Sequence, residues 1–476
     1  MKTPPAAAPN KIIGLLLSVA ALGLLAGGCS TYQQQGSAIN SNWQQGNLTN
    51  AVLEATNKAQ DNANNKDAII WRLEQAAILR ANGQYDDSNK AFDLAQEKID
   101  QYEQDAKVNV VREAGALMSN QAELPYQGRA YDGIMLNTYK ALNYLALGEP
   151  DKARPEIIRA YQRQQDAVEE NKQLIEKVQD QANSDSNSKA ITAAENDPKF
   201  QALMQDANYS KLDSLKGYAD YVNPFTVYLD GLFFMTNSAD ASDLDRAHTS
   251  FERVNAFIGD NDYIKQDLAT VNDLIGGKPL SPTTYVIFET GCAPVRDQVR
   301  IDIPIIVSRV SYVGAAFPTL KIQGNYISGL TVTANGVSSP TTLLSSMDGV
   351  IGLDFKNELP IIITKTIAAT AAKAIAAYAV NNAMQQQDAM VGLFSQIATA
   401  AYQAAVNVAD ERTWTTLPKE FQFCRIPTPP DRKIDLVSAG GLQTIPVTIA
   451  DGTVNIVYVR SINAATPLLV SQMKLK

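Results

Sequence analysis

Residues 131–165, YDGIMLNTYKALNYLALGEPDKARPEIIRAYQRQQ, decide the fold of the N-terminal half of the chain. They predict two helices joined by a tight turn at Gly148-Glu149-Pro150. The second helix places Ala153, Ile157 and Ala160 at steps of four and three, which puts them on one stripe. One helical hairpin cannot cover both of its apolar faces, so the sequence predicts further hairpins stacked beside it.

Three other segments show the same pattern of two helices around a turn, and they are residues 37–60, 67–100 and 224–257. The small and aromatic residues that follow Gly83, the turn glycine of the second segment, are Tyr85, Ser88, Phe92 and Ala95. This spacing resembles the tetratricopeptide repeat. We therefore expect tetratricopeptide-like helical repeats over residues 41–275, interrupted by insertions. The alternative is a plain helical bundle, in which these small and aromatic residues only pack the core.

Residues 276–476 have the pattern of a β-rich domain. Alternating β-branched and aromatic residues predict strands at 284–289, 298–309, 318–322, 330–333, 421–426, 445–450 and 453–460. The clearest predicted hairpin joins the last two strands, because Asp451-Gly452 between them is a favoured two-residue turn. A helical insertion is expected at residues 341–411. The sequence thus predicts an α+β protein with helical hairpins first and a β-rich domain second.

The middle of the helical insertion, LPIIITKTIAATAAKAIAAYAVNNA, is rich in alanine. Small residues allow helices to approach closely, so a buried core helix is one interpretation. An oligomer contact is a second interpretation, and insertion into a membrane is a third. Two lysines and several threonines disfavour the membrane interpretation.

Residues 1–28 have the pattern of a bacterial lipoprotein signal peptide. Lys2 and Lys11 give a basic start, and residues 12–25 form an apolar run that is too short to span a membrane. The following Leu25-Ala26-Gly27-Gly28-Cys29 resembles a lipobox, in which the cysteine is acylated and becomes the first residue. A plain secretory signal is the alternative. Ser30, in place of the aspartate that retains lipoproteins in the inner membrane, favours the outer membrane.

The lipid on Cys29 would hold the protein to the outer membrane, facing the periplasm, through a polar tether at residues 29–40. The net charge is −9, and nucleic acid is therefore not an expected partner. We expect the partners to be other envelope proteins, and oligomerisation is also compatible with the sequence.

Cys292 and Cys424 are the cysteines that remain after Cys29 is acylated. Both lie in the β-rich half, and the periplasm is oxidising, so a disulfide between them is one prediction. Two separate buried thiols are the alternative.

Two tryptophans are candidate partner-binding residues. Trp71 lies in the first helix of its hairpin, and first helices line the concave face on which helical repeats bind peptides. Trp414 follows the charged run Asp410-Glu411-Arg412. Packing within the core is the alternative interpretation for both side chains.

Several segments are similar to an uncharacterised family of proteobacterial outer-membrane lipoproteins with a tetratricopeptide-like N-terminal half. The segments are YDGIMLNTYKALNYLALGEPDKAR, NPF at 223–225, YVIFETGCAPVR, LDFKNELPIIITK and VADERTWTTLP. Genes of this family tend to lie beside those of small lipoproteins similar to activators of penicillin-binding proteins. The resemblance therefore implies a role in envelope assembly. It assigns no catalytic residue.

No motif in the sequence identifies a catalysed reaction. His248 is the single histidine, and the Gly-x-Ser-x-Gly, His-Glu-x-x-His and Gly-x-Gly-x-x-Gly motifs are absent. We therefore predict no catalytic residue, cofactor or metal. The expected function is a lipid-anchored scaffold in envelope assembly or secretion. The alternatives are a subunit of an oligomeric secretion or pore complex and an envelope hydrolase that uses paired carboxylates.

Overall fold

The computed structural model describes residues 31–108, 121–182, 191–215, 217–218, 221–307, 310–385 and 408–476. The protein is 54% helical and 20% strand, which makes it an α+β protein as the sequence predicts. The helices of the first half end at Ile275 and the first strand begins at Thr283. The change of composition after residue 275 thus marks a real change of secondary structure.

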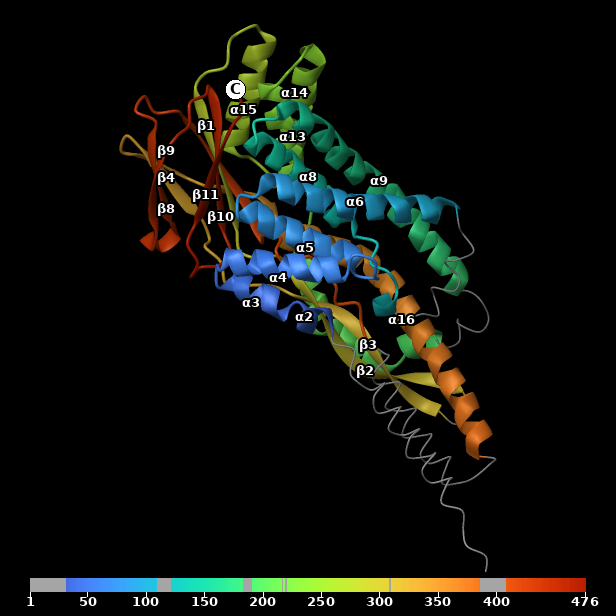
Figure 1. Ribbon diagram of the computed structural model, residues 1–476. Coiled ribbons are helices and arrows are strands. Elements are labelled where there is room, and N and C mark those ends of the chain that lie inside the picture. Colours follow the sequence, from blue (N-terminus) through green and yellow to red (C-terminus); the bar gives the residue numbers. More distant parts are fainter. Residues whose placement is uncertain are drawn as a thin grey trace, which may run out of the picture.

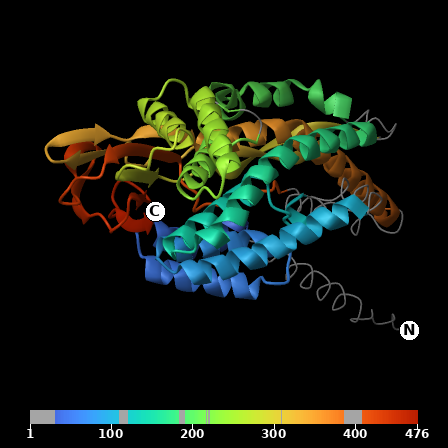
Figure 2. The same ribbon diagram turned by 90° about the horizontal axis from the view of Figure 1, so that it is seen from above.

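Ten of the described helices of the first half pack in chain order, each against the next of the ten (Figure 1). Their bounds are α2 (Tyr32–Gln35), α3 (Ser37–Gln44), α4 (Leu48–Asp61), α5 (Ala68–Ala81), α6 (Tyr85–Val108), α8 (Ala130–Ala146), α9 (Pro150–Ala182), α13 (Pro224–Thr236), α14 (Ala241–Ile258) and α15 (Asp262–Ile275). Figure 2 shows α6 and α9 running alongside each other. Arg163 of α9 joins them, because its guanidinium lies 2.8 Å from Asp100 and 2.7 Å from Glu103 of α6.

The turn between α5 and α6 shows why these residues form a hairpin. Gly83 has a φ of +76°, a conformation that glycine adopts without strain. Ser88 then donates its hydroxyl to the Ala76 carbonyl at 2.7 Å, and Phe92 and Ala95 are fully buried. The structure confirms the predicted helical hairpins. Their assignment as tetratricopeptide-like repeats stays a prediction.

The strands form three sheets. The central sheet has the order β11-β10-β1-β7-β6, a second pairs β2 with β3, and a third has the order β5-β4-β8-β9. Their bounds are β1 (Thr283–Thr290), β2 (Val295–Val307), β3 (Val310–Lys321), β4 (Leu330–Ala334), β5 (Val337–Pro340), β6 (Thr342–Ser346), β7 (Glu420–Pro427), β8 (Lys433–Ser438), β9 (Thr444–Thr448), β10 (Val454–Ser461) and β11 (Leu469–Lys474).

The predicted hairpin around Asp451-Gly452 is wrong. β9 pairs with β8 in the third sheet, whereas β10 runs parallel to β1 and antiparallel to β11 in the central sheet. All eight residues of β10 are buried, so this strand needs covering on both faces. A two-stranded hairpin with β9 would leave β10 exposed. Between β1 and β11 in the central sheet, β10 is buried along its whole length.

The long helix of the second half is α16 (Met347–Gln385), which lies along β2 and β3 (Figure 1). It occupies only part of the predicted insertion at 341–411, because residues 342–346 form β6 instead of helix. The short helices α11 (Pro198–Gln205) and α12 (Ala207–Ser210) also pack on β2 and β3. None of the described helices combines the length and hydropathy of a membrane span.

The tether prediction is wrong for residues 31–40, which belong to the folded body. Thr31 caps α2, and the Tyr32 ring packs 4.6 Å from the Trp71 ring, centroid to centroid. Tyr32 and Ile39 are buried. Two apolar side chains among polar neighbours are enough to dock this short segment on the helices that follow it.

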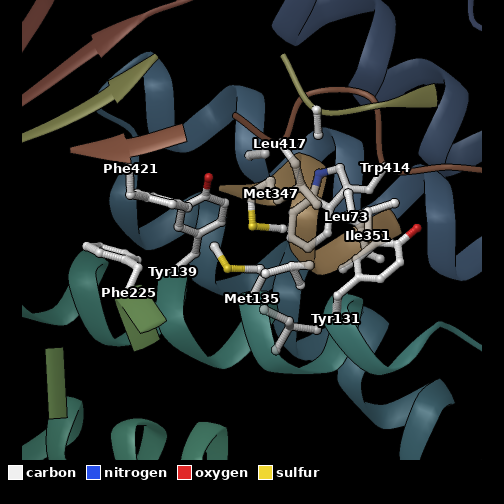
Figure 3. Packing of buried hydrophobic residues seen from close by; sticks show 14 of the residues in the cluster. Leu73, Tyr131, Met135, Tyr139, Phe225, Met347, Ile351, Trp414, Leu417 and Phe421 are labelled. Atoms are coloured by element: carbon white, nitrogen blue, oxygen red, sulfur yellow. The ribbon is translucent and has the colours of Figure 1, made fainter. Parts of the chain in front are cut away.

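One apolar core joins the two halves of the molecule. It contains residues from Tyr32 of α2 to Leu475 near the C-terminus. Figure 3 shows its centre, where Met135 and Tyr139 of α8 meet Met347 of α16 and Trp414. The ring of Phe225 stacks on that of Phe421 from β7, at 4.0 Å between centroids. The helices and the central sheet therefore form one packed body.

Candidate functional site

A pocket of about 430 Å³ lies between the helical layer and the central sheet. α3 to α6 and α8 line one side, and β1, β10 and β11 line the other. Its apolar lining residues include Trp43, Leu48, Ala77, Ala81, Leu468 and Val470, and the buried polar ones are Arg80, Tyr139, Glu289, Thr416, Tyr458 and Arg460. Apolar walls with a few converging polar groups are typical of small-molecule sites, and the volume fits that class.

Glu289, at the end of β1, organises the polar part of the pocket. Its Oε2 accepts a hydrogen bond from the Tyr458 hydroxyl at 2.7 Å, and its Oε1 accepts one from the Tyr139 hydroxyl. Burial and the Glu289 charge raise the pKa of both tyrosines well above the usual value, so both stay protonated donors. The carboxylate of Glu289 is thus held by the protein itself.

Arg460 is likewise occupied by protein groups. Its Nη1 donates to the carbonyl oxygens of Gly291 at 2.7 Å and Ser461 at 2.6 Å, and its Nε lies 3.7 Å from Glu289. The guanidinium also lies over the Trp43 ring, 5.5 Å from its centroid. Arg460 therefore fixes the end of β10 and the pocket wall.

Arg80, on the last turn of α5, is held differently. Its Nη1 donates to the Asn143 Oδ1 at 2.8 Å, and its guanidinium lies 5.1 Å from the Tyr139 ring centroid and 4.8 Å from that of Tyr458. Burial acts against its charge, but Tyr458 and Glu289 outweigh burial and raise the pKa of Arg80. Arg80 is 7% exposed and stays a cation in the pocket.

Residues 408–419, which we call the clasp, cross the inner face of the helical layer. Glu74 of α5 accepts hydrogen bonds from the Thr415 hydroxyl and the Thr416 hydroxyl, each at 2.7 Å. Trp414 packs edge-on against Phe92 of α6 and Tyr139 of α8, at 5.9 Å between centroids in each case. The clasp thus covers the faces of α5, α6 and α8 that carry Glu74, Phe92 and Tyr139.

Buried ion pairs fix the start of the clasp. Arg412 contacts Asp67 at 3.0 Å and Asp410 at 2.7 Å, and it donates to the Leu124 carbonyl at 2.8 Å. Burial alone would raise the pKa of Asp410. The surrounding arginines, first of all Arg412, outweigh burial and hold this pKa below its ordinary value. The clasp is therefore joined to the helical layer by charge as well as by packing.

A second group of charges lies where α8, β2 and α16 meet. Arg129 Nη1 and Arg296 Nη2 contact the same Glu358 oxygen at 2.8 Å and 2.6 Å. Burial opposes the charge of Glu358, but the two arginines lower its pKa. Burial and the Glu358 charge raise the pKa of Asp354, one helical turn earlier. Neither carboxyl lines the pocket, so we assign this pair to the junction of the elements rather than to a reaction.

The described residues contain no group of His, Cys, Asp and Glu that could hold a metal ion. His248 lies on α14 with its Nδ1 3.6 Å from Glu252, and it does not line the pocket. Among the charged residues of the pocket, Glu289 and Arg460 are held by protein groups, whereas Arg80 hydrogen-bonds only the neutral side chain of Asn143 among the bonds described above.

The structure contradicts the predicted roles of both tryptophans. Trp71 is 1% exposed and Trp414 is fully buried, so neither can contact a partner protein. Trp71 packs against the tilted ring of Tyr32, because the segment before α3 lies against α5. Trp414 is buried because the clasp occupies the inner helical face. Packing, the alternative interpretation, is the correct one for both.

Cys292 and Cys424 are both free and buried, so the predicted disulfide is wrong. Cys292 belongs to the main core, whereas Cys424 of β7 belongs to a separate apolar cluster on the other face of the central sheet. Burial raises the pKa of the Cys424 thiol to about 12. Cys29 lies outside the described residues.

The polar residues of the pocket carry no clear signal in the sequence. Arg80 interrupts the apolar helix AIIWRLEQAAILRA, and Glu289 ends the apolar strand TTYVIFET. A charged residue near the end of an apolar helix or strand does not identify a binding site, because helices and strands that reach the surface commonly end in the same way. Only the fold brings Arg80, Glu289 and Arg460 to one place.

The fold and the site define an α+β protein in which helical hairpins and a mixed sheet enclose a pocket with apolar walls and polar groups. Comparisons with protein family models, curated proteins and solved structures find no match.

Proposed function

We propose that this protein is a lipid-anchored scaffold on the periplasmic side of the bacterial outer membrane, where tetratricopeptide-like hairpins bind other envelope proteins. The lipobox at Cys29 supports the anchor. Tyr32, three residues later, is already buried in the body. An acylated Cys29 would therefore hold the folded body close to the membrane surface rather than on a long tether.

The observation that carries the scaffold proposal is the position of the exposed apolar side chains on the helical layer. Leu53 lies on α4, Leu94 on α6, and Ile158 and Val168 on α9, with exposed fractions of 38 to 57%. These are the second helices of three successive hairpins. We place the partner's contacts at these exposed apolar side chains, because each lies on the second helix of its hairpin.

The closed inner face restricts where that partner can dock. Tetratricopeptide-type arrays bind peptides on the face of the first helices, which here are α5 and α8. The clasp and the central sheet cover that face through Glu74, Trp414 and Tyr139. The proposal therefore places partners on the outer face of α4, α6 and α9.

Site-specific photo-cross-linking in living cells tests the docking face. A photoreactive phenylalanine analogue replaces Leu53, Leu94 or Ile158, and each variant should give an adduct with the same envelope protein. Val337 is the matched control, because it is 68% exposed but lies at the β4–β5 turn. Adducts at Val337 alone, or none at the three helical positions, would refute the proposed face.

The membrane anchor has its own test. Cys29→Ser should abolish incorporation of labelled palmitate and leave the signal peptide uncleaved. The wild-type protein should incorporate the labelled palmitate and should sediment with the outer membrane in a density gradient. A mature wild-type protein with an unacylated N-terminus would disprove the anchor, whatever the cross-linking shows.

A further inference from the structure

We propose that the pocket between α5 and the central sheet binds a small amphipathic anion, with a carboxylate or phosphate monoester head on Arg80 and a hydrocarbon body against the apolar walls. This site is independent of the proposed docking face, which lies on the outer helices. The inference rests on the charges that the protein leaves available and on the shape of the walls.

Arg80 is the charged residue of the pocket that can bind an anion. Glu289 receives two tyrosine hydroxyls, and Arg460 donates to several backbone carbonyls, so both groups serve the protein. Arg80 has five N–H donors and hydrogen-bonds the neutral amide of Asn143. No carboxylate of the described residues forms an ion pair with it within 4.0 Å. Glu289 acts on Arg80 from beyond ion-pair distance and is itself bound by two tyrosine hydroxyls and next to Arg460, so the buried Arg80 guanidinium can still pair directly with an anionic ligand.

The rings around Arg80 fix its orientation. Tyr139 and Tyr458 lie within 5.1 Å of the guanidinium, centroid to carbon, and both are anchored on Glu289. A planar guanidinium held in this way offers parallel N–H donors that match the two oxygens of a carboxylate or phosphate. The donor geometry is thus set before a ligand arrives, which lowers the entropy cost of binding.

The walls select the rest of the ligand. Leu48, Ala81, Leu469 and Val470 are the partly exposed apolar residues of the lining, while Asn82 and Gly83 are exposed at the rim. A free inorganic anion would leave these apolar side chains uncovered. A hydrocarbon chain or aromatic group on the anion would cover them and gain the free energy of removing apolar surface from water. The volume of about 430 Å³ fits a ligand of small-molecule size.

Isothermal titration calorimetry on the full chain in phospholipid nanodiscs tests this site, with empty nanodiscs as the background. The probes are octanoate, octyl phosphate, octylammonium and inorganic phosphate. We expect saturable binding of octanoate or octyl phosphate, at least ten-fold tighter than that of octylammonium and inorganic phosphate. The comparison of octanoate with octyl phosphate identifies the preferred head group. Equal binding of octylammonium, or no saturable binding of either anion, would overturn the proposal.

Two variants connect binding to the pocket. Arg80→Met should weaken the preferred anion by roughly ten- to hundred-fold, the usual worth of a charge-assisted hydrogen bond. Ala81→Phe, at the partly exposed end of α5, should fill the pocket and weaken binding similarly. Arg72→Met is the matched control, because Arg72 lies on the same helix, does not line the pocket and should leave affinity within two-fold.

Circular dichroism melting shows whether each variant folds. If Arg80→Met unfolds, Ala81→Phe decides the question, since it changes no charge or hydrogen bond. Unchanged affinity in a folded Ala81→Phe, or an equal loss in Arg72→Met, would show that the anion binds elsewhere.

Discussion

At the scale of single residues, Asp267 shows how burial controls a charge. The carboxylate of this α15 residue accepts hydrogen bonds from Tyr285 at 2.7 Å and Tyr228 at 3.0 Å, and Arg425 lies 3.1 Å away. Burial nevertheless dominates these contacts and raises the pKa of Asp267 to about 6. The pKa of Asp132 is raised to about 6 for the same reason.

This shift predicts the sign of a pH effect on stability. An unfolded aspartate ionises near pH 4, whereas folded Asp267 resists ionisation until about pH 6, so the folded state binds more protons between these values. The free energy of unfolding should therefore fall as the pH rises from 4 to 6. The contribution of this residue is on the order of 3 kcal/mol.

Asp267→Asn should remove that contribution and make the pH dependence shallower, because the amide does not titrate, while Asp132 still titrates in the same range. Urea unfolding at pH 4.5, 5.5 and 7 measures the slope. Asp262→Asn is the control on the same helix, since the Asp262 side chain is 89% exposed. A slope that is unchanged in Asp267→Asn would contradict the assignment.

At the scale of the elements, the clasp holds the helical layer to the sheet. The sequence flagged its residues Asp410, Arg412 and Trp414 as a charged run beside an aromatic, but it could not show what they contact. Arg412 pairs with Asp67, which is 345 residues earlier in the chain. Such a contact follows from the tertiary fold and has no local pattern.

Arg412→Met should destabilise the protein by about 3–5 kcal/mol, because it leaves the buried carboxylate of Asp67 without its arginine and leaves Asp410 with only the more distant Arg129, at 3.7 Å. Urea unfolding measures the loss. Lys265→Met is the control, since Lys265 is half exposed and its pairs with Asp260 and Asp262 are worth at most about 1 kcal/mol. A loss below 1 kcal/mol in Arg412→Met would show that the clasp is held by packing alone.

The turns show which elements the sequence predicted well. Asn335-Gly336 joins β4 to β5 with φ values of +48° and +78°, as an Asn-Gly hairpin turn requires. Asp451-Gly452 has an equally favourable composition but joins strands of different sheets. The two turns differ because β10 is buried along its whole length. A two-residue turn motif carries no information about the burial of the strand that follows it.

At the scale of the whole molecule, the common core predicts a single cooperative unit. Trp414 and Phe421 from the second half pack on Tyr139 and Phe225 from the first half (Figure 3). Neither the helical layer nor the sheet can lose its partner without exposing apolar surface. The boundary near residue 275 therefore separates two kinds of structure within one core.

Hydrogen exchange with increasing urea tests this cooperativity. Peptides from α8 and from β10 should lose protection with the same midpoint, because both lie in the same core. A fragment ending at residue 275 should not fold, since Trp71, Tyr139 and Phe225 would lose part of their cover. Two separate midpoints, or a folded fragment, would show independent domains instead.

The sequence alone determined the local structure: the α+β class, the helical hairpins with their glycine turns, and most strands. These features follow from periodicity and turn chemistry, which act between residues close in the chain. The tertiary structure decided the partners of β10, the burial of Trp71 and Trp414, the separation of the cysteines and the pocket around Arg80. An apolar stripe specifies that a face must be covered, but the element that covers it can come from any part of the chain.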